Sequence, residues 1–333
     1  MRRRSFQTDS AVTFTINRQE KIKVMKIGID LGGTNIAGGL VSDDGTLVLK
    51  KSVPTDSSRG ELGICEDIVS LIRALSDETD EKITSVGIGV PGFADDRTGV
   101  VIYCNNIPFA NTHLAEYVTR ETSLPAFIGN DANAAVLAEA RVGIAKDYEN
   151  VVMITLGTGI GSGLIFNNKL FTGCNGAAGE LGHVSLFPDG IPCTCGRNGC
   201  YELYASATAL KRQTQEAMEK HPESMLWDVA KSTGGVTGKT AFDAMRAGDE
   251  TGKAVVDGYI NYLSLGLVDV VNLLQPDVVI FGGGISKEGE TLLAPLREII
   301  HKKSYCSGGK YPELLIAKLG NDAGIIGAAY FGE

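Results

Sequence analysis

The chain carries the same pattern of glycine and apolar residues twice, 124 positions apart. Residues 33–40 align without a gap with residues 157–164, and both stretches begin with Gly-Thr and end with Gly-Leu. The turn pair Asp43-Asp44 then aligns with Asn167-Asn168. Two unrelated glycine-rich hairpins are the alternative, but the matched turn favours an internal structural repeat. A strand, glycine loop, strand and hairpin built twice predicts two α/β lobes of related design, whose glycine loops could face each other across a cleft.

Short apolar runs and helical spacing complete both lobes. The strands expected from apolar runs are residues 26–31, 36–42, 46–52, 85–90, 126–128, 278–281 and 314–317. Apolar residues at helical spacing predict helices over residues 62–75, 114–121, 131–141, 203–220, 224–231, 252–274, 291–302 and 323–330.

Charge and hydropathy exclude two classes of partner. The net charge of -9 argues against a nucleic-acid binder, which needs a basic footprint. No run approaches the roughly 20 apolar residues that span a bilayer. Arg2, Arg3 and Arg4 could begin a signal peptide, but residues 11–16 alternate apolar and polar residues and are too short for its apolar region. We therefore expect a cytoplasmic protein without nucleic-acid or membrane partners. Residues 1–24 are expected to be a disordered extension, because Met25 directly precedes the first clear strand.

The first glycine loop has the composition of a phosphate site. Asp30 ends a strand and is followed by Gly32-Gly33-Thr34. Consecutive backbone N–H groups in such a turn can point at phosphate oxygens, and an adjacent carboxylate can hold Mg²⁺. The loop lacks the Gly-Lys-Ser/Thr ending of a Walker A motif. Paired with Gly157-Thr158-Gly159 it indicates that the cleft binds ATP, the alternative being two tight hairpins without a ligand.

Asn130-Asp131 stands between a short strand and an alanine-rich helix. A carboxylate is favoured at the positive end of a helix. An ionised Asp aimed at a substrate hydroxyl can accept its proton while that oxygen attacks a phosphoryl group. The residues alone also fit a helix cap.

Four metal-binding side chains are spaced His-x9-Cys-x-Cys-x4-Cys, at His183, Cys193, Cys195 and Cys200. Three thiolates and an imidazole make a closed tetrahedral zinc site, so the zinc would be structural. A reduced or disulfide-bridged loop is the alternative.

Two carboxylates flank this metal motif. Glu180 lies three residues before His183, and Glu202 lies two after Cys200. Folding of the loop around a metal would bring both near one point, where paired carboxylates can bind the vicinal hydroxyls of a sugar. A solvated surface role is the alternative for each.

Taken together, these motifs resemble those of the ROK family (repressors, open reading frames and kinases). Residues 156–164, Gly173 and residues 179–183 resemble its signature, and residues 193–202 resemble its zinc loop. Residues 30–34 and 282–284 resemble its nucleotide loops. The resemblance extends from about Met25 to the C-terminus.

The resemblance implies a two-lobed actin-like ATPase (ribonuclease H-like) fold, with ATP and sugar in the cleft between the lobes. Residues 25–135, completed by the C-terminal segment 318–333, would form the small α/β lobe. Residues 136–317 would form the large α/β lobe that carries the zinc loop. A homodimer is the family expectation.

The resemblance also implies roles for single residues. Asp131 would be the catalytic base, and His183 would serve both zinc and sugar. The sugar would contact Gly92, Asn105, Asn130, Asp131, Glu180, His183 and Glu202. ATP would be bound by Asp30, Gly32, Gly33, Thr34, Asn35, Gly157, Thr158 and Gly159, with Gly282 and Gly283 near the adenosine.

The expected reaction is transfer of the γ-phosphoryl group of ATP to a hexose. Glucose is the first choice, because the chain most resembles the family's bacterial glucokinases. Residues 105–109 read Asn-Asn-Ile-Pro-Phe where many glucokinases have Asn-Leu-x-Gly-Trp, so N-acetylmannosamine, N-acetylglucosamine, fructose, mannose and allose remain alternatives. A sugar-responsive repressor is disfavoured, because residues 1–24 show no pair of helical patterns. A non-catalytic sugar-binding module is the third alternative.

Overall fold

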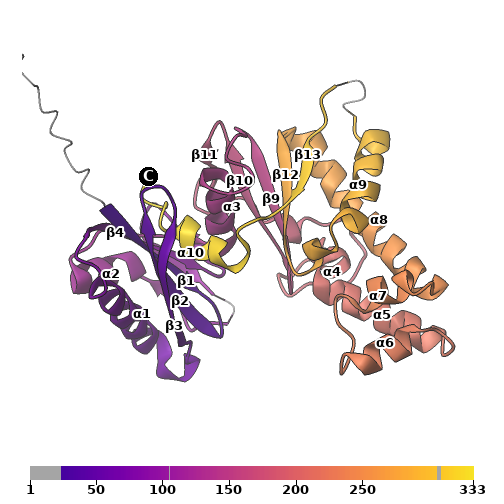
Figure 1. The fold of residues 1–333 in the computed structure, drawn as a ribbon, viewed down its shortest axis with the longest axis horizontal. Coiled ribbons are helices and arrows are strands. Elements are labelled where there is room, and N and C mark those ends of the chain that lie inside the picture. The colour runs from indigo at the N-terminus through magenta and orange to yellow at the C-terminus, as the bar shows by residue number, and fades with distance from the viewer. Residues whose placement is uncertain (1–23, 105, 306–308) are drawn as a thin grey trace, which may run out of the picture.

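Two five-stranded sheets form the centres of two lobes in the computed structural model (Figure 1). The structure describes residues 24–104, 106–305 and 309–333. The first sheet has the order β3 (Leu47–Pro54), β2 (Asn35–Ser42), β1 (Val24–Leu31), β4 (Lys82–Val90), β8 (Ala126–Asn130). The second has the order β11 (Lys169–Leu170), β10 (Ile160–Phe166), β9 (Val151–Leu156), β12 (Val278–Gly283), β13 (Glu313–Ile316).

The two sheets have the same topology, which confirms the internal repeat. In each sheet the first two pairings are antiparallel and the last two are parallel. The matched turns are also both built on left-handed backbone. Asn167 and Asn168 have φ of 51° and 61°, and Gly45 has φ of 81°. Asparagine and glycine adopt this conformation with the least strain.

Each lobe has its own apolar core. In the first lobe α1 (Gly60–Ser76) and α2 (Leu114–Thr122) cover one face of the sheet, and α1 buries Ile64, Ile68 and Ile72 against it. The second lobe packs its helices around α8 (Glu250–Leu274). The others there are α4 (Glu202–Ala205), α5 (Ala207–Lys220), α6 (Leu226–Ser232), α7 (Thr240–Arg246) and α9 (Glu290–Lys303). By length and composition α8 could cross a membrane, but half of its most apolar window is buried inside the lobe.

Two helices lie between the sheets, α3 (Asp131–Arg141) and α10 (Ala323–Ala328) (Figure 1). Glycines allow their backbones to approach the neighbouring elements closely. A Cβ at Gly28 of β1 would lie 1.8 Å from the Ile325 carbonyl oxygen, and one at Gly327 would lie 1.6 Å from the Ala134 carbonyl oxygen. The C-terminal helix therefore packs against β1 and α3 at once.

Three expectations about the elements were wrong or incomplete. The helix predicted over residues 203–220 is two helices, because the Ser206 side chain accepts a hydrogen bond from Ala209 N–H and begins α5. The sequence did not predict α7 or the small sheet β5 (Phe93–Asp95), β6 (Val100–Tyr103), β7 (Ala110–Thr112). The predicted extension, residues 1–24, lies outside the described residues apart from Val24, which begins β1.

Candidate active site

Asp131 is the first residue of α3, directly after β8, and Asn130 caps the helix. The Asn130 Oδ1 accepts hydrogen bonds from the N–H groups of Ala132 at 2.8 Å and Asn133 at 3.3 Å, and its Nδ2 donates to the Gly92 carbonyl at 3.1 Å. The Ala132 N–H also donates to Asp131 Oδ1 at 2.8 Å. The helix is thus capped by Asn130. Asp131 is exposed, and its Oδ2 accepts no hydrogen bond from a described residue.

Asp30 brings a second carboxylate to the same place. It is the last but one residue of β1, and it lies close enough to Asp131 to be affected by that charge. Burial and the negative charge of Asp131 raise the pKa of Asp30 to about 6, partly offset by Lys50. Surrounding protein likewise raises the pKa of Asp131, because desolvation disfavours its charged form. Two carboxylates with raised pKa values are suited to proton transfer and to binding a cation.

Glu180, His183 and Glu202 meet near these carboxylates. Burial raises the pKa of Glu180, the positive charge of His183 lowers it, and the charges of Asp131 and Glu202 raise it. His183 Nδ1 lies 3.6 Å from Glu202 Oε1. The structure therefore brings together five of the side chains predicted for sugar and phosphate.

The predicted metal ligands are also brought together. The ligand atoms of His183, Cys193, Cys195 and Cys200 all lie within 4.8 Å of one another. Cys195 and Cys200 Sγ are 3.6 Å apart, and Cys193 Sγ lies 3.7 Å from His183 Nδ1. Four soft ligands at these separations fit a tetrahedral zinc ion.

Tight turns shape this metal loop. Gly196 and Gly199 have φ of 87° and 68°, and a Cβ at Gly199 would lie 1.7 Å from the Phe187 carbonyl oxygen. Glu202, the first residue of α4, follows directly, with Oε1 3.6 Å from Cys193 Sγ. Any group that orders the loop therefore also positions Glu202.

The first glycine loop joins β1 to β2 and is held at its base. The Gly32 N–H donates to the Asn35 carbonyl at 2.9 Å, and the Thr55 hydroxyl donates to the Gly32 carbonyl at 2.7 Å. Gly33, Thr34 and Asn35 are exposed. They are available to a ligand.

The second glycine loop joins β9 to β10 in the same way. The Gly157 N–H donates to the Gly159 carbonyl at 3.1 Å, and Thr158 is exposed. A Cβ at Gly159 would lie 2.4 Å from Glu202 Oε2, so this glycine lets the loop approach the Glu202 carboxylate closely. Next to it, Gly283 ends β12 with φ of 83° and is exposed, whereas Gly282 is buried.

Of two further residues predicted to contact the sugar, the structure describes Gly92 but not Asn105. Gly92 follows β4 with φ of 93°, and a Cβ there would lie 2.4 Å from the Tyr103 carbonyl oxygen. The Gly92 carbonyl accepts the hydrogen bond from Asn130 Nδ2 and so helps to position the Asn130 side chain. Asn105 lies outside the described residues.

Sequence reasoning missed two residues that support the site. Lys50 of β3 lies near Asp30 and forms an ion pair with Asp322 at 2.6 Å. The buried Ser162 of β10 accepts a hydrogen bond from the Leu181 N–H at 3.3 Å and donates one to the Gly179 carbonyl, which fixes the segment that carries Glu180. Lys50 belongs to no motif, and Ser162 lies within residues 156–164, where only the glycines suggested a role.

Two equivalent sheets that present glycine loops and carboxylates between them define an actin-like ATPase fold of the sugar-kinase class. The chain belongs to the ROK family, whose model matches residues 26–332.

Known proteins of this family are similar over almost the whole chain. A glucokinase of Halalkalibacterium halodurans is 37% identical over 308 residues, which cover 91% of this chain and 93% of the relative. A glucokinase of Thermotoga maritima is 38% identical and covers 92% and 96%. The crystal structure of a ROK family glucokinase from Streptomyces griseus, in complex with glucose and AMPPNP, is 36% identical. It has a TM-score of 0.76 and covers 92% of this chain and 98% of that one.

Proposed function

We propose that this chain is an ATP-dependent sugar kinase that phosphorylates the 6-hydroxyl of a hexose, with glucose as its substrate. The observation that carries the proposal is that Asp30 and Glu180 both lie close enough to Asp131 to be affected by its charge, while each of the two sheets carries one glycine loop. The similarity to glucokinases over more than nine-tenths of the chain supports the choice of sugar.

The geometry supports Asp131 as general base. One oxygen is held by the Ala132 N–H, and the other is free to accept the proton of a hexose hydroxyl. The raised pKa makes the carboxylate a stronger base than an ordinary aspartate. Glu180, His183 and Glu202 then fix the sugar by its other hydroxyls, so that the attacking oxygen faces the phosphate.

The backbone N–H groups of the two glycine loops hold the polyphosphate from opposite lobes, with Gly283 beside the adenosine. Asp30 is the residue that would hold Mg²⁺, which when bound neutralises phosphate charge. His183, Cys193, Cys195 and Cys200 would hold a structural zinc, which orders the loop between Glu180 and Glu202.

The proposal also covers the boundaries of the two lobes, the oligomeric state and the ligands. Residues 25–135 with residues 318–333 form the small lobe, and residues 136–317 form the large lobe. We further propose that the enzyme works in the cytoplasm as a homodimer, that its ligands are sugar and ATP, and that it binds no nucleic acid.

A substrate panel tests the reaction and the sugar. ADP release with MgATP is measured against glucose, mannose, fructose, allose, N-acetylglucosamine and N-acetylmannosamine. We expect the highest kcat/KM with glucose. A preference for another sugar would contradict the glucose assignment, and no turnover with any of them would contradict the kinase.

Asp131→Asn tests the base. We expect kcat to fall by about 100-fold or more, because the amide cannot accept the proton, while the Kd for glucose changes little. Asp43→Asn, at the exposed β2–β3 turn, is the matched control and should keep wild-type kcat. Equal kcat values for the two variants would remove Asp131 from the role.

A further inference from the structure

A cavity of about 580 Å³ lies between the lobes along α3, and the reaction does not use it. Its walls include Asn133, Leu137 and Arg141 of α3, Lys169 and Leu170 of β11, and Asp96 beyond β5. The volume is that of a small-molecule site. Asp30, Asp131, Glu180, His183 and Glu202 do not line it. Asn130 does, but its side-chain amide is already bonded to Gly92 and to the first turn of α3.

The walls of this cavity belong to both lobes. Ala94 and Asp96 come from the segment around β5, and Lys169 and Leu170 come from the second sheet. At its edge the Arg97 Nη2 donates to the Gly173 carbonyl at 2.8 Å, which joins the two sides. Any rotation of one lobe against the other must change the shape of the cavity, so its occupant and lobe movement are linked.

Charges on the walls are balanced. Arg141 is 3.8 Å from Glu333, which also lines the cavity. Lys169 and Asp96 supply one further charge of each sign, and neither forms an ion pair with a described residue. Asn168 and Thr172 add uncharged polar groups, and Tyr330 and Phe331 add aromatic surface. This lining suits a neutral polar molecule better than an anion or a cation.

Two oxygens in the wall lack donors. Asn133 Oδ1 and Asp96 Oδ1 are buried, and neither accepts a hydrogen bond from a described residue. Asn133 is only 3% exposed. A buried acceptor without a donor destabilises the fold, so a donor brought to either oxygen would be favourable. Both oxygens are covered by protein, so a side chain must turn before a hydroxyl group in the cavity can donate to it.

We propose that this cavity is a second, non-catalytic site for a neutral monosaccharide, and that its occupancy biases the movement of the lobes. The proposal rests on the proposed function, in which a sugar is the substrate. A sugar offers several hydroxyl donors and acceptors, has no charge, and fits a wall that mixes amides, carboxylate, guanidinium and aromatic rings. Because the cavity adjoins the segment that leads to Glu180 and the turn that carries Asn130, a bound sugar is linked to the active site.

Binding stoichiometry tests the site. Radiolabelled 6-deoxyglucose, which lacks the hydroxyl that is phosphorylated, is equilibrated with the full chain by dialysis at rising concentration. We expect two molecules per chain at saturation. One molecule per chain would overturn the proposal, and so would displacement of the second molecule by inorganic phosphate, because the site would then belong to an anion.

Two variants locate the second molecule. Asn133→Leu replaces the amide by an apolar group of the same branching, and Leu170→Trp places an indole ring in the cavity. Both should bind one molecule of 6-deoxyglucose and still phosphorylate glucose. If both bind two, the second molecule lies elsewhere and the proposal fails.

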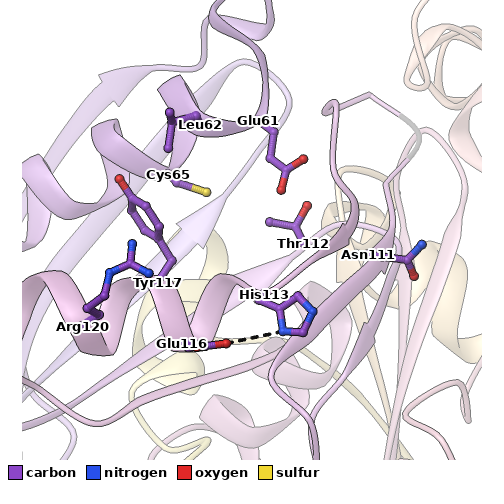
Figure 2. A pocket seen from close by; sticks show the side chains of 9 residues that line it. All are labelled: Glu61, Leu62, Cys65, Asn111, Thr112, His113, Glu116, Tyr117 and Arg120. Atoms are coloured by element: carbon purple, nitrogen blue, oxygen red, sulfur yellow. Dashed lines mark ion pairs between the residues drawn. The ribbon is translucent and has the colours of Figure 1, made fainter.

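Figure 2 shows the place for the matched control, a pocket of about 360 Å³ between α1 and α2 on one lobe. Leu62 lines it from α1, opposite His113 and Glu116, which form an ion pair at 3.5 Å. Leu62→Trp adds the same bulk there and should keep two bound molecules. A loss of one molecule in this control as well would attribute the effect to the added tryptophan and overturn the assignment by Leu170→Trp.

Turnover separates the two proposals. With glucose and MgATP, wild-type velocity should depart from a single hyperbola at high glucose, and Asn133→Leu should follow one hyperbola. Absence of turnover with any sugar would refute the proposed kinase. Normal turnover with a single hyperbola and one bound sugar would refute the second site alone.

Discussion

Asp30 lies close enough to Asp131 to be affected by its charge, and this proximity has an energetic cost. Burial and the charge of Asp131 raise the pKa of Asp30 from 3.8 to about 6. The folded state therefore disfavours the ionised form that a phosphate site needs. Strain of this kind is typical of residues retained for function.

Asp30→Asn should stabilise the fold near neutral pH, because it removes a charge that the folded state disfavours. Above about pH 6 the carboxylate is ionised in both states, and the folded state carries the full cost. Between about pH 6 and pH 4 the folded state takes up the proton first, so the cost disappears. The gain in thermal midpoint, measured without Mg²⁺, should amount to a few degrees at about pH 7.5 and shrink toward pH 4.

The exposed Asp80→Asn is the control for this measurement. It should leave the midpoint unchanged across the same range. Equal midpoints for the two variants at neutral pH would show that Asp30 carries no such cost.

At the scale of elements, one carboxylate links the two segments that connect the lobes. Glu139 of α3 is fully buried. Its Oε1 accepts hydrogen bonds from the N–H groups of Lys318 and Leu319, both at 2.7 Å, and its Oε2 accepts one from Ile144 at 2.9 Å. The segment at 318–319 leads from β13 to α10, so Glu139 joins α3 to the path of the other helix between the lobes.

Glu139→Gln should destabilise the protein by about 1–3 kcal/mol, because the amide nitrogen that replaces one carboxylate oxygen cannot accept the hydrogen bonds made to that oxygen. The change is measured as the shift in the urea midpoint. Glu298→Gln, in a surface pair with Lys302 at 3.6 Å, should change stability by less than about 1 kcal/mol. A Glu139 variant as stable as this control would show that the link is unimportant.

The limits of sequence reasoning are clearest at this scale. The bounds of α3 were predicted correctly, because an asparagine cap and an alanine-rich run are local signals. The strands β5, β6 and β7 were not predicted, because runs of three or four residues carry too little periodicity. The role of Glu139 was also beyond reach, since two of its partners lie 179 and 180 residues away. The spacing of the metal ligands was local enough to predict the cluster that the structure shows.

At the scale of the whole molecule, the zinc proposal predicts that metal and sugar recognition are lost together. Cys195→Ser removes one of the four ligands and should lower the thermal midpoint by more than about 5 °C. The KM for glucose should rise in parallel, because Glu202 and Glu180 flank the loop. Elemental analysis should find about one zinc per wild-type chain and much less in the variant.

Cys174→Ser is the matched control, because Cys174 is exposed and lies outside the cluster. It should retain zinc, midpoint and KM. Freshly purified wild-type protein without zinc would contradict the proposal directly.

The shared order of the two sheets has an evolutionary consequence. The residues that repeat in the two loops, Gly33-Thr34 and Gly157-Thr158, are among those proposed for phosphate. Three of the residues proposed for sugar, Glu180, His183 and Glu202, lie between β11 and β12, in a stretch much longer than the corresponding one between β3 and β4. A duplicated half would thus have supplied the phosphate chemistry, and later insertions the choice of substrate. Such a chain can change its sugar in the inserted loops while its inherited half-sites go on handling ATP unchanged.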